Sequence, residues 1–148
     1  MFVVIFVSAI LVVATVAVHL GVLQAVTTLL PYLRKYPRWG VGAMILGAIV
    51  GHLVEIGLFD LGITALAASG HYGSLVGDGV RGGEAVRDHF YFSAVTFTSL
   101  GYGDVTPVGP LRVLAAVEAL TGMVLIAWTA SFTFFLMMKQ WEIEDRLE

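Results

Sequence analysis

Apolar residues occur along this chain in three long runs, separated by stretches in which glycines and charged residues gather. The runs cover residues 2–30, 39–68 and 111–138. Each is longer than the roughly 20 apolar residues that a helix needs to cross a hydrocarbon core. The pattern therefore predicts three transmembrane helices. The first is long enough that it must tilt or protrude.

A fourth apolar segment, residues 89–98, is too short to cross. Ten residues of helix reach about 15 Å, which is half of the hydrocarbon core. The closely spaced Gly101 and Gly103 follow it. Irregular backbone at membrane depth is tolerated only where it is buried in protein or lines a cavity. We therefore expect a re-entrant half-helix whose negative C-terminal end favours a cation near the membrane centre.

The composition restricts the function classes. Of 148 residues, 58% are apolar and 13% are charged, whereas soluble domains are about half apolar and a quarter charged. The chain is thus predicted to be an integral membrane protein with a retained first helix. A net charge of −3 gives no sign of nucleic-acid binding, and the absence of cysteine excludes disulfides and thiolate metal sites in this chain. No arginine ladder, phosphate-binding glycine loop or catalytic Ser/His/Asp grouping is present, so we expect neither an enzyme nor a cofactor.

The run from Thr98 to Asp104 carries the most specific chemistry. Its two glycines stand at alternate positions, and glycine adopts positive φ without a steric penalty. Such a chain can turn successive carbonyl oxygens the same way, and a row of carbonyls can replace the water shell of a monovalent cation. The run resembles the selectivity filter of the pore-loop potassium channel family, with Pro107 and an apolar helix following it.

The resemblance covers residues 88–141 and implies a potassium-selective channel. Ser99 stands where the family usually has Thr and Leu100 where it usually has Val, which leaves a weakly selective monovalent cation channel as an alternative. In that family four loops meet on one axis, so the resemblance, together with one loop per chain and no internal repeat, implies a homotetramer. The implied permeant ion is K⁺, held at Ser99, Leu100, Gly101 and Tyr102, and the filter residues are Thr98, Ser99, Leu100, Gly101, Tyr102 and Gly103.

Three residues are assigned to filter support. Asp104 lies at the outer mouth, where its counterpart in relatives bonds to a Trp. Here the aromatic pair is Tyr91-Phe92, and Phe92 has no donor. Glu118 lies inside the last span, where a carboxylate facing lipid costs about 3 kcal/mol. We expect it behind the filter, bonded to a pore-helix hydroxyl such as that of Thr96; a role in ion attraction or proton sensing stays open.

The last helix carries the expected gating elements. Gly122 matches the gating hinge of the family, and close helix packing is an equally good explanation of this glycine. The same alignment places Met123, Ile126 and Ala130 along the wall of a cavity beneath the filter.

A second polar group lies in the middle span. His52 and Glu55 are spaced i, i+3, which recurs in helical metal sites. A buried His–Glu hydrogen bond, or packing against Gln24 or His19 of the first span, is the favoured interpretation. The remote alternative is a membrane metal-binding enzyme using His52 and Glu55, with Asp60 or Glu118 added.

The predicted fold is an all-α membrane protein with three transmembrane helices, a re-entrant pore helix and a selectivity filter. A re-entrant loop begins and ends on one face, and the basic loop containing Arg34, Lys35 and Arg38 indicates the cytoplasmic face. The N-terminus is therefore predicted outside a cell membrane and the C-terminus inside. Residues 1–38 form an extra N-terminal helix and basic loop; residues 39–148 form the pore domain, with outer helix 39–68, extracellular loop 69–88, pore helix and filter 89–104, inner helix 111–139 and a short cytoplasmic tail.

Overall fold

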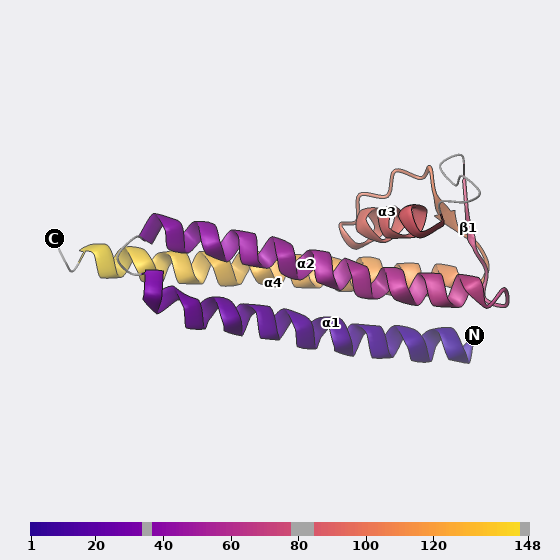
Figure 1. The fold of residues 1–148 in the computed structure, drawn as a ribbon, viewed down its shortest axis with the longest axis horizontal. Coiled ribbons are helices and arrows are strands. Elements are labelled where there is room, and N and C mark those ends of the chain that lie inside the picture. The colour runs from indigo at the N-terminus through magenta and orange to yellow at the C-terminus, as the bar shows by residue number, and fades with distance from the viewer. Residues whose placement is uncertain (34–36, 78–84, 146–148) are drawn as a thin grey trace.

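Three long helices run side by side along the length of the molecule (Figure 1). The structure, a computed structural model, describes residues 1–33, 37–77 and 85–145. The predicted loop residues Arg34, Lys35, Asp78, Arg81 and Glu84, and the side chain of Arg38, lie outside this description. The elements in chain order are α1 (Phe2–Leu29), the 3-10 turn η1 (Leu30–Leu33), α2 (Pro37–Ala68), β1 (Leu75–Val76), α3 (Ala85–Phe97), β2 (Thr106–Pro107) and α4 (Leu111–Asp145).

The apolar runs form the helices that they predict. Residues 2–29, 40–68 and 111–139 are long and apolar enough to cross a membrane, with mean hydropathies of 2.8, 1.9 and 1.8. The prediction of an all-α membrane protein with three spans is thus confirmed. Pro37 is the first residue of α2. Proline suits the first helical position, where its missing N–H group would have no partner.

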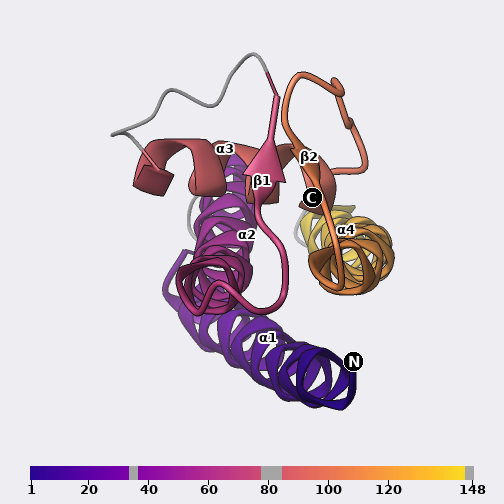
Figure 2. The same ribbon diagram turned by 90° about the vertical axis from the view of Figure 1, so that its right-hand side faces the viewer.

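The short helix α3 lies against the α2–α4 pair at the end of the bundle that carries the N-terminus. In Figures 1 and 2, α3 and α1 lie on opposite faces of that pair. The C-terminus lies at the other end of the bundle (Figure 1). The first helix therefore packs on the side of the pair that faces away from the segment resembling a filter.

A small sheet joins the segment before α3 to the segment that follows residues 98–104. Strands β1 and β2 are antiparallel, with Leu75 opposite Pro107 and Val76 opposite Thr106. The sequence predicts an extracellular loop over residues 69–88 and a pore helix from residue 89. Within that loop range the structure has β1, and α3 begins at Ala85, four residues before the expected start of the pore helix. Two-residue strands are too short to show an alternating pattern.

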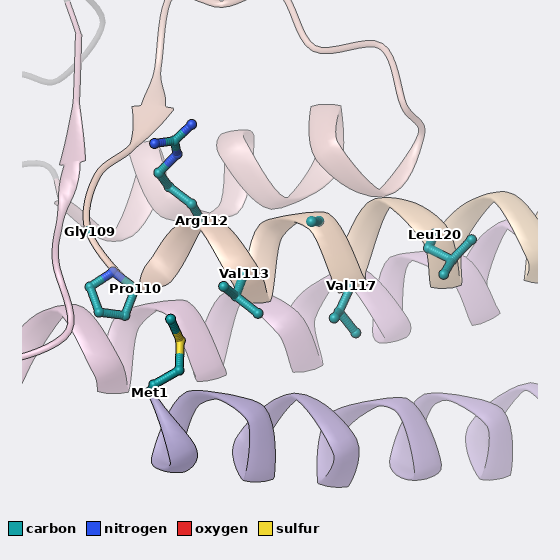
Figure 3. Close-up of a pocket in the computed structure, with 8 residues that line it drawn as sticks. Met1, Gly109, Pro110, Arg112, Val113, Val117 and Leu120 are labelled. Atoms are coloured by element: carbon teal, nitrogen blue, oxygen red, sulfur yellow. The ribbon is translucent and has the colours of Figure 1, made fainter.

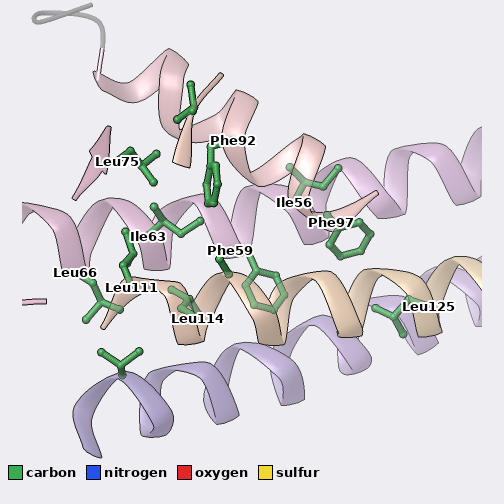
Figure 4. Close-up of a cluster of buried hydrophobic side chains, with 13 residues drawn as sticks. Ile56, Phe59, Ile63, Leu66, Leu75, Phe92, Phe97, Leu111, Leu114 and Leu125 are labelled. Atoms are coloured by element: carbon green, nitrogen blue, oxygen red, sulfur yellow. The ribbon is translucent and has the colours of Figure 1, made fainter. Parts of the chain in front are cut away.

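The main core forms where α3 packs on α2 and α4 (Figure 4). Phe59 and Ile63 of α2, Phe97 of α3 and Leu111 and Leu114 of α4 are all fully buried. Burial of one such side chain stabilises a fold by about 1.5–3 kcal/mol. The core therefore fixes the short helix against two long ones.

Two glycines of α2 allow α1 to approach closely. A Cβ at Gly47 would lie 2.9 Å from Val26 Cγ2, and one at Gly51 would lie 3.1 Å from Val22 Cγ1. Small residues spaced four apart let two helix backbones come together. The two glycines therefore form the place where α2 packs closely against α1.

Candidate functional site

The short helix α3 lies against the α2–α4 pair and ends partway along it (Figure 1). Its 13 residues correspond to about 20 Å of helix, less than a hydrocarbon core of about 30 Å. After Phe97 the chain leaves the helix as an irregular ribbon, residues 98–104. It then returns to the end of the bundle from which α3 started (Figure 1). This is the re-entrant path that the short apolar segment predicts.

Backbone hydrogen bonds anchor the start of the ribbon to the last turn of α3. The N–H of Ser99 donates to the Thr96 carbonyl at 2.9 Å, while those of Leu100 and Gly101 donate to the Val95 carbonyl at 2.9 and 3.1 Å. These bonds satisfy carbonyls that a helix end would otherwise leave unpaired. The N–H groups at the start of the ribbon consequently face the helix.

The ribbon backbone has left-handed residues at every second position. The φ angles are 57° at Ser99, 51° at Gly101 and 83° at Gly103. Glycine takes this conformation freely, but for a residue with a Cβ it costs about 1–2 kcal/mol. Two glycines at alternate positions suit this backbone conformation. Ser99 adopts it as well, at a cost in backbone strain because it has a Cβ.

The ribbon is open on one side of the chain. Residues 98–103 are all exposed, with 57% of Leu100 and 67% of Tyr102 accessible. These two large side chains stand two residues apart in a ribbon of small and polar residues, and they form a surface suited to contact with another protein surface.

The outer end of the ribbon is tied to α3 by a side-chain hydrogen bond. The Tyr91 hydroxyl donates to Asp104 Oδ2 at 2.9 Å, and Asp104 Oδ1 accepts the N–H of Val105 at 3.1 Å. The bond to the carboxylate raises the pKa of the Tyr91 phenol above its usual value of 10. Tyr91 thus provides the donor that Phe92 lacks, and its bond to Asp104 fixes the outer end of the ribbon to α3.

A buried polar contact lies behind α3. Glu118 of α4 is fully buried, and its Oε1 contacts the hydroxyl of Ser93, which also donates to the Ile56 carbonyl at 2.9 Å. The predicted partner, Thr96, was therefore wrong: Ser93 lies on the face of α3 that packs on α4. One hydroxyl has one proton, so both contacts are satisfied when Glu118 is a neutral carboxylic acid that donates to Ser93.

The α4 backbone touches the end of α3 at Gly122. A Cβ built on this glycine would lie 2.0 Å from the Phe97 carbonyl oxygen. Gly122 therefore allows close packing at the point where the ribbon begins. Further along α4, Met123, Ile126 and Ala130 are exposed, with 57% of Met123 and 38% of Ile126 accessible. Their spacing places them along one side of the helix.

A groove of about 800 Å³ lies away from the ribbon, between the first residue and the start of α4 (Figure 3). Met1 and Arg112 lie at its outer end, and Val113, Val117 and Leu120 form an apolar wall (Figure 3). The groove contains no residue of the ribbon or of α3. It is a groove between the start of α1 and the start of α4, separate from the candidate site.

The polar residues of the middle span meet a residue of α1. His52 Nδ1 lies 2.8 Å from Glu55 Oε2, and His19 Nδ1 lies 2.9 Å from Glu55 Oε1. The predicted His–Glu hydrogen bond is confirmed, as is the packing against His19. Glu118 bonds to Ser93 instead, so it does not add to this group.

The sequence matches the family model described as "Ion channel" over residues 61–139, which run from the middle of α2 through the ribbon to α4. The match covers more than half of the chain. The chain belongs to the ion-channel family. This membership, together with the re-entrant segment, identifies a membrane channel and not an enzyme.

Curated relatives match a shorter part of the channel. Protein LctB of Bacillus caldotenax is 44% identical over 50 residues, and protein LctB of Geobacillus stearothermophilus is 46% identical over 50 residues. Each alignment covers 34% of this chain and 37% of the relative. The inward rectifier potassium channel Kirbac3.1 of Paramagnetospirillum magnetotacticum is 44% identical over 48 residues, 32% of this chain and 16% of that protein. The channel thus spans well under half of these relatives' length, and no solved structure matches it.

Proposed function

We propose that four copies of this channel assemble around one axis and conduct K⁺ passively through a carbonyl-lined filter. The observation that carries the proposal is the left-handed backbone at Ser99, Gly101 and Gly103, in a ribbon anchored by its N–H groups to α3. Alternating peptide planes of this kind can direct carbonyl oxygens to one side. Rings of such oxygens, one from each chain, replace the hydration shell of a potassium ion.

The ion pathway follows from the order of residues along the ribbon. Carbonyls of residues 98–103 form successive rings, and the Ser99 hydroxyl adds the innermost ligand. Thr98 uses its own hydroxyl to bond the Ala94 carbonyl at 2.8 Å. The C-terminal end of α3 points its partial negative charge toward the inner end of the filter, where it stabilises a dehydrated cation.

The exposed surfaces support a closed ring of four chains. Leu100 and Tyr102 supply apolar surface beside the ribbon, and a heterologous contact repeated four times would bury it. Met123, Ile126 and Ala130 then line a cavity beneath the filter, and Gly122 is the hinge of the inner helix. The N-terminus and the outer mouth of the filter face the outside of the cell membrane, and the C-terminus lies in the cytoplasm.

The test is a planar-bilayer recording of the purified channel under opposing K⁺ and Na⁺ gradients. A reversal potential close to the K⁺ equilibrium value supports the proposal. A reversal potential near zero rejects K⁺ selectivity. Cross-linking in detergent gives the assembly state, and a largest species other than four chains rejects the tetramer.

Two substitutions in the filter favour a second candidate, a weakly selective monovalent cation channel. Ser99 has a smaller side chain than the Thr that is usual there, and Leu100 has a different shape from Val. Both changes alter packing behind the carbonyls rather than the carbonyls themselves. The same recording separates the candidates, because weak selectivity gives a reversal potential between zero and the K⁺ value.

A further inference from the structure

Side chains from three helices meet in a polar cluster inside the bundle, on the side of α4 that faces α1. Glu55 is fully buried, and each of its carboxylate oxygens lies against the Nδ1 atom of one histidine, His19 or His52. On the far side of both rings lies the hydroxyl of Thr129 of α4. Its oxygen is 3.1 Å from His52 Nε2 and 3.5 Å from His19 Nε2.

With both imidazoles neutral, a count of hydrogens leaves this cluster one positive charge short. If Glu55 is ionised and both imidazoles are neutral, each ring must carry its hydrogen on Nδ1 to bond the carboxylate. Both Nε2 atoms then present lone pairs to Thr129. The hydroxyl has only one hydrogen, so one Nε2 atom faces an oxygen lone pair. A net negative charge also stays at membrane depth, which is unfavourable.

A cation between the carboxylate and the two Nδ1 atoms would neutralise the negative charge and leave both Nε2 atoms free to carry a hydrogen. Coordination through Nδ1 leaves each ring with its hydrogen on Nε2, and the Thr129 oxygen has two lone pairs to accept both. Metal-bound histidines commonly donate their second N–H to such an outer partner. We propose that His19, His52 and Glu55 bind a divalent transition-metal ion, with Thr129 orienting both imidazoles.

The geometry of the three ligands fits such an ion. Their ligand atoms all lie within 4.8 Å of one another. Each histidine nitrogen is 2.8 or 2.9 Å from a Glu55 oxygen, close to the roughly 3.0 Å that separates adjacent ligands of a six-coordinate ion with bonds of about 2.1 Å. Two imidazoles and a carboxylate are a ligand set used by zinc, cobalt, nickel and non-haem iron.

Aromatic rings close the apolar sides of the cluster. The Trp128 ring lies 5.4 Å from that of His19, and the Phe97 ring lies 5.9 Å from that of His52. His52 has 18% of its side chain exposed and is the least enclosed of the three ligands. An apolar shell with one open side limits water at the site and strengthens the bonds to the ion.

The site would connect the first helix to the inner helix. Thr129 is seven residues, or about 10 Å of helix, beyond Gly122. A bound ion would hold α1, α2 and α4 together just below the contact between Gly122 and Phe97. This assigns α1 a role that does not depend on potassium conduction.

The test uses the purified full-length channel in detergent, stripped with a chelator and then titrated with Zn²⁺ and Co²⁺. We expect about one ion per chain, a higher unfolding temperature with metal, and a Co²⁺ absorption spectrum typical of nitrogen and oxygen ligands. Glu55→Gln, which keeps the side-chain size, and His19→Asn, which keeps a polar side chain, should abolish this binding. Thr129→Val should weaken it roughly 10- to 100-fold.

His71→Asn is the matched control. This histidine is exposed, and its Nδ1 contacts the Ser69 carbonyl, away from the cluster. The control should bind metal as the unmodified channel does. The proposal is overturned if the unmodified channel binds neither ion, in which case the cluster shares a proton instead. It is also overturned if Glu55→Gln binds as tightly as the unmodified channel, or if His71→Asn loses the same amount. None of these outcomes depends on whether the channel selects K⁺.

Discussion

The two faces of α4 are built by different means. Toward α3 the contact depends on backbone geometry: Gly122 lets a carbonyl of α3 approach, and the ribbon that follows has left-handed residues at alternate positions. Toward α1 the contact depends on polar side chains, with Thr129 meeting His19 and His52. A backbone constraint restricts which residues are allowed at one position. A side-chain cluster needs partners from distant positions, and is therefore much harder to foresee.

The largest expected effect comes from filling the space at Gly122. Gly122→Val would place atoms against the Phe97 carbonyl, which belongs to backbone and cannot move aside. Overpacking of this kind should cost about 3 kcal/mol or more in unfolding free energy. Thermal unfolding in detergent, followed by circular dichroism, measures the loss.

Gly57→Ala provides the control for that experiment. A Cβ at this α2 glycine meets nothing within 4 Å, and alanine favours a helix by about 1 kcal/mol relative to glycine. The control should be neutral or stabilising. Equal losses for the two variants would mean that the close contact on the α3 side of α4 is not what makes Gly122 necessary.

The next effect concerns the polar contact on the same face. Ser93→Ala removes the partner of Glu118 and should cost about 1–3 kcal/mol, because a buried polar group is left without a hydrogen bond. Glu118→Gln keeps a neutral polar group of the same shape and should cost less than about 1 kcal/mol. Chemical unfolding of both variants tests this order. A larger loss for Glu118→Gln would indicate an ionised carboxylate at this site.

The features that the sequence predicts well are those that depend on neighbouring residues, as the α3 face of α4 does. Run length and apolar content predict all three spans, and the short segment before Gly101 and Gly103 predicts the re-entrant path. These features depend on the bilayer thickness and on the conformational range of glycine. Both act locally, so they can be read from consecutive residues.

What the sequence did not predict depends on helix rotation and on distant partners. Ser93 and Thr96 are one turn apart, and only the rotation of α3 against α4 decides which of them meets Glu118. Thr129 lies 110 residues from His19, and no local pattern connects them. The β1–β2 pairing is missed because each strand has only two residues.

The backbone of the ribbon gives the third effect. Gly101 has a φ of 51°, and Gly101→Ala adds a Cβ to that conformation at a cost of about 1–2 kcal/mol. Open space surrounds this position in the single chain, so the cost is conformational rather than steric. We expect K⁺ flux into vesicles to fall roughly tenfold as the peptide plane turns. Gly42→Ala, a helical glycine with no close neighbour, should leave flux unchanged.

The smallest effect concerns the hydrogen bond at the outer end of the ribbon. Tyr91→Phe removes the bond to Asp104 and should lower the unfolding temperature only slightly, since both side chains are exposed. Because the pKa of Tyr91 is raised, the bond stabilises the folded channel below pH 10 and is lost as the pH rises through the raised value. The unmodified channel should therefore be more stable to unfolding than Tyr91→Phe at neutral pH, and this difference should disappear only at strongly alkaline pH. Tyr32→Phe, at a tyrosine with 84% of its surface exposed, should behave like the unmodified channel throughout. A constant difference between the Tyr91 variant and the unmodified channel up to the highest pH would mean that ring packing, not the bond to Asp104, holds the outer end of the ribbon.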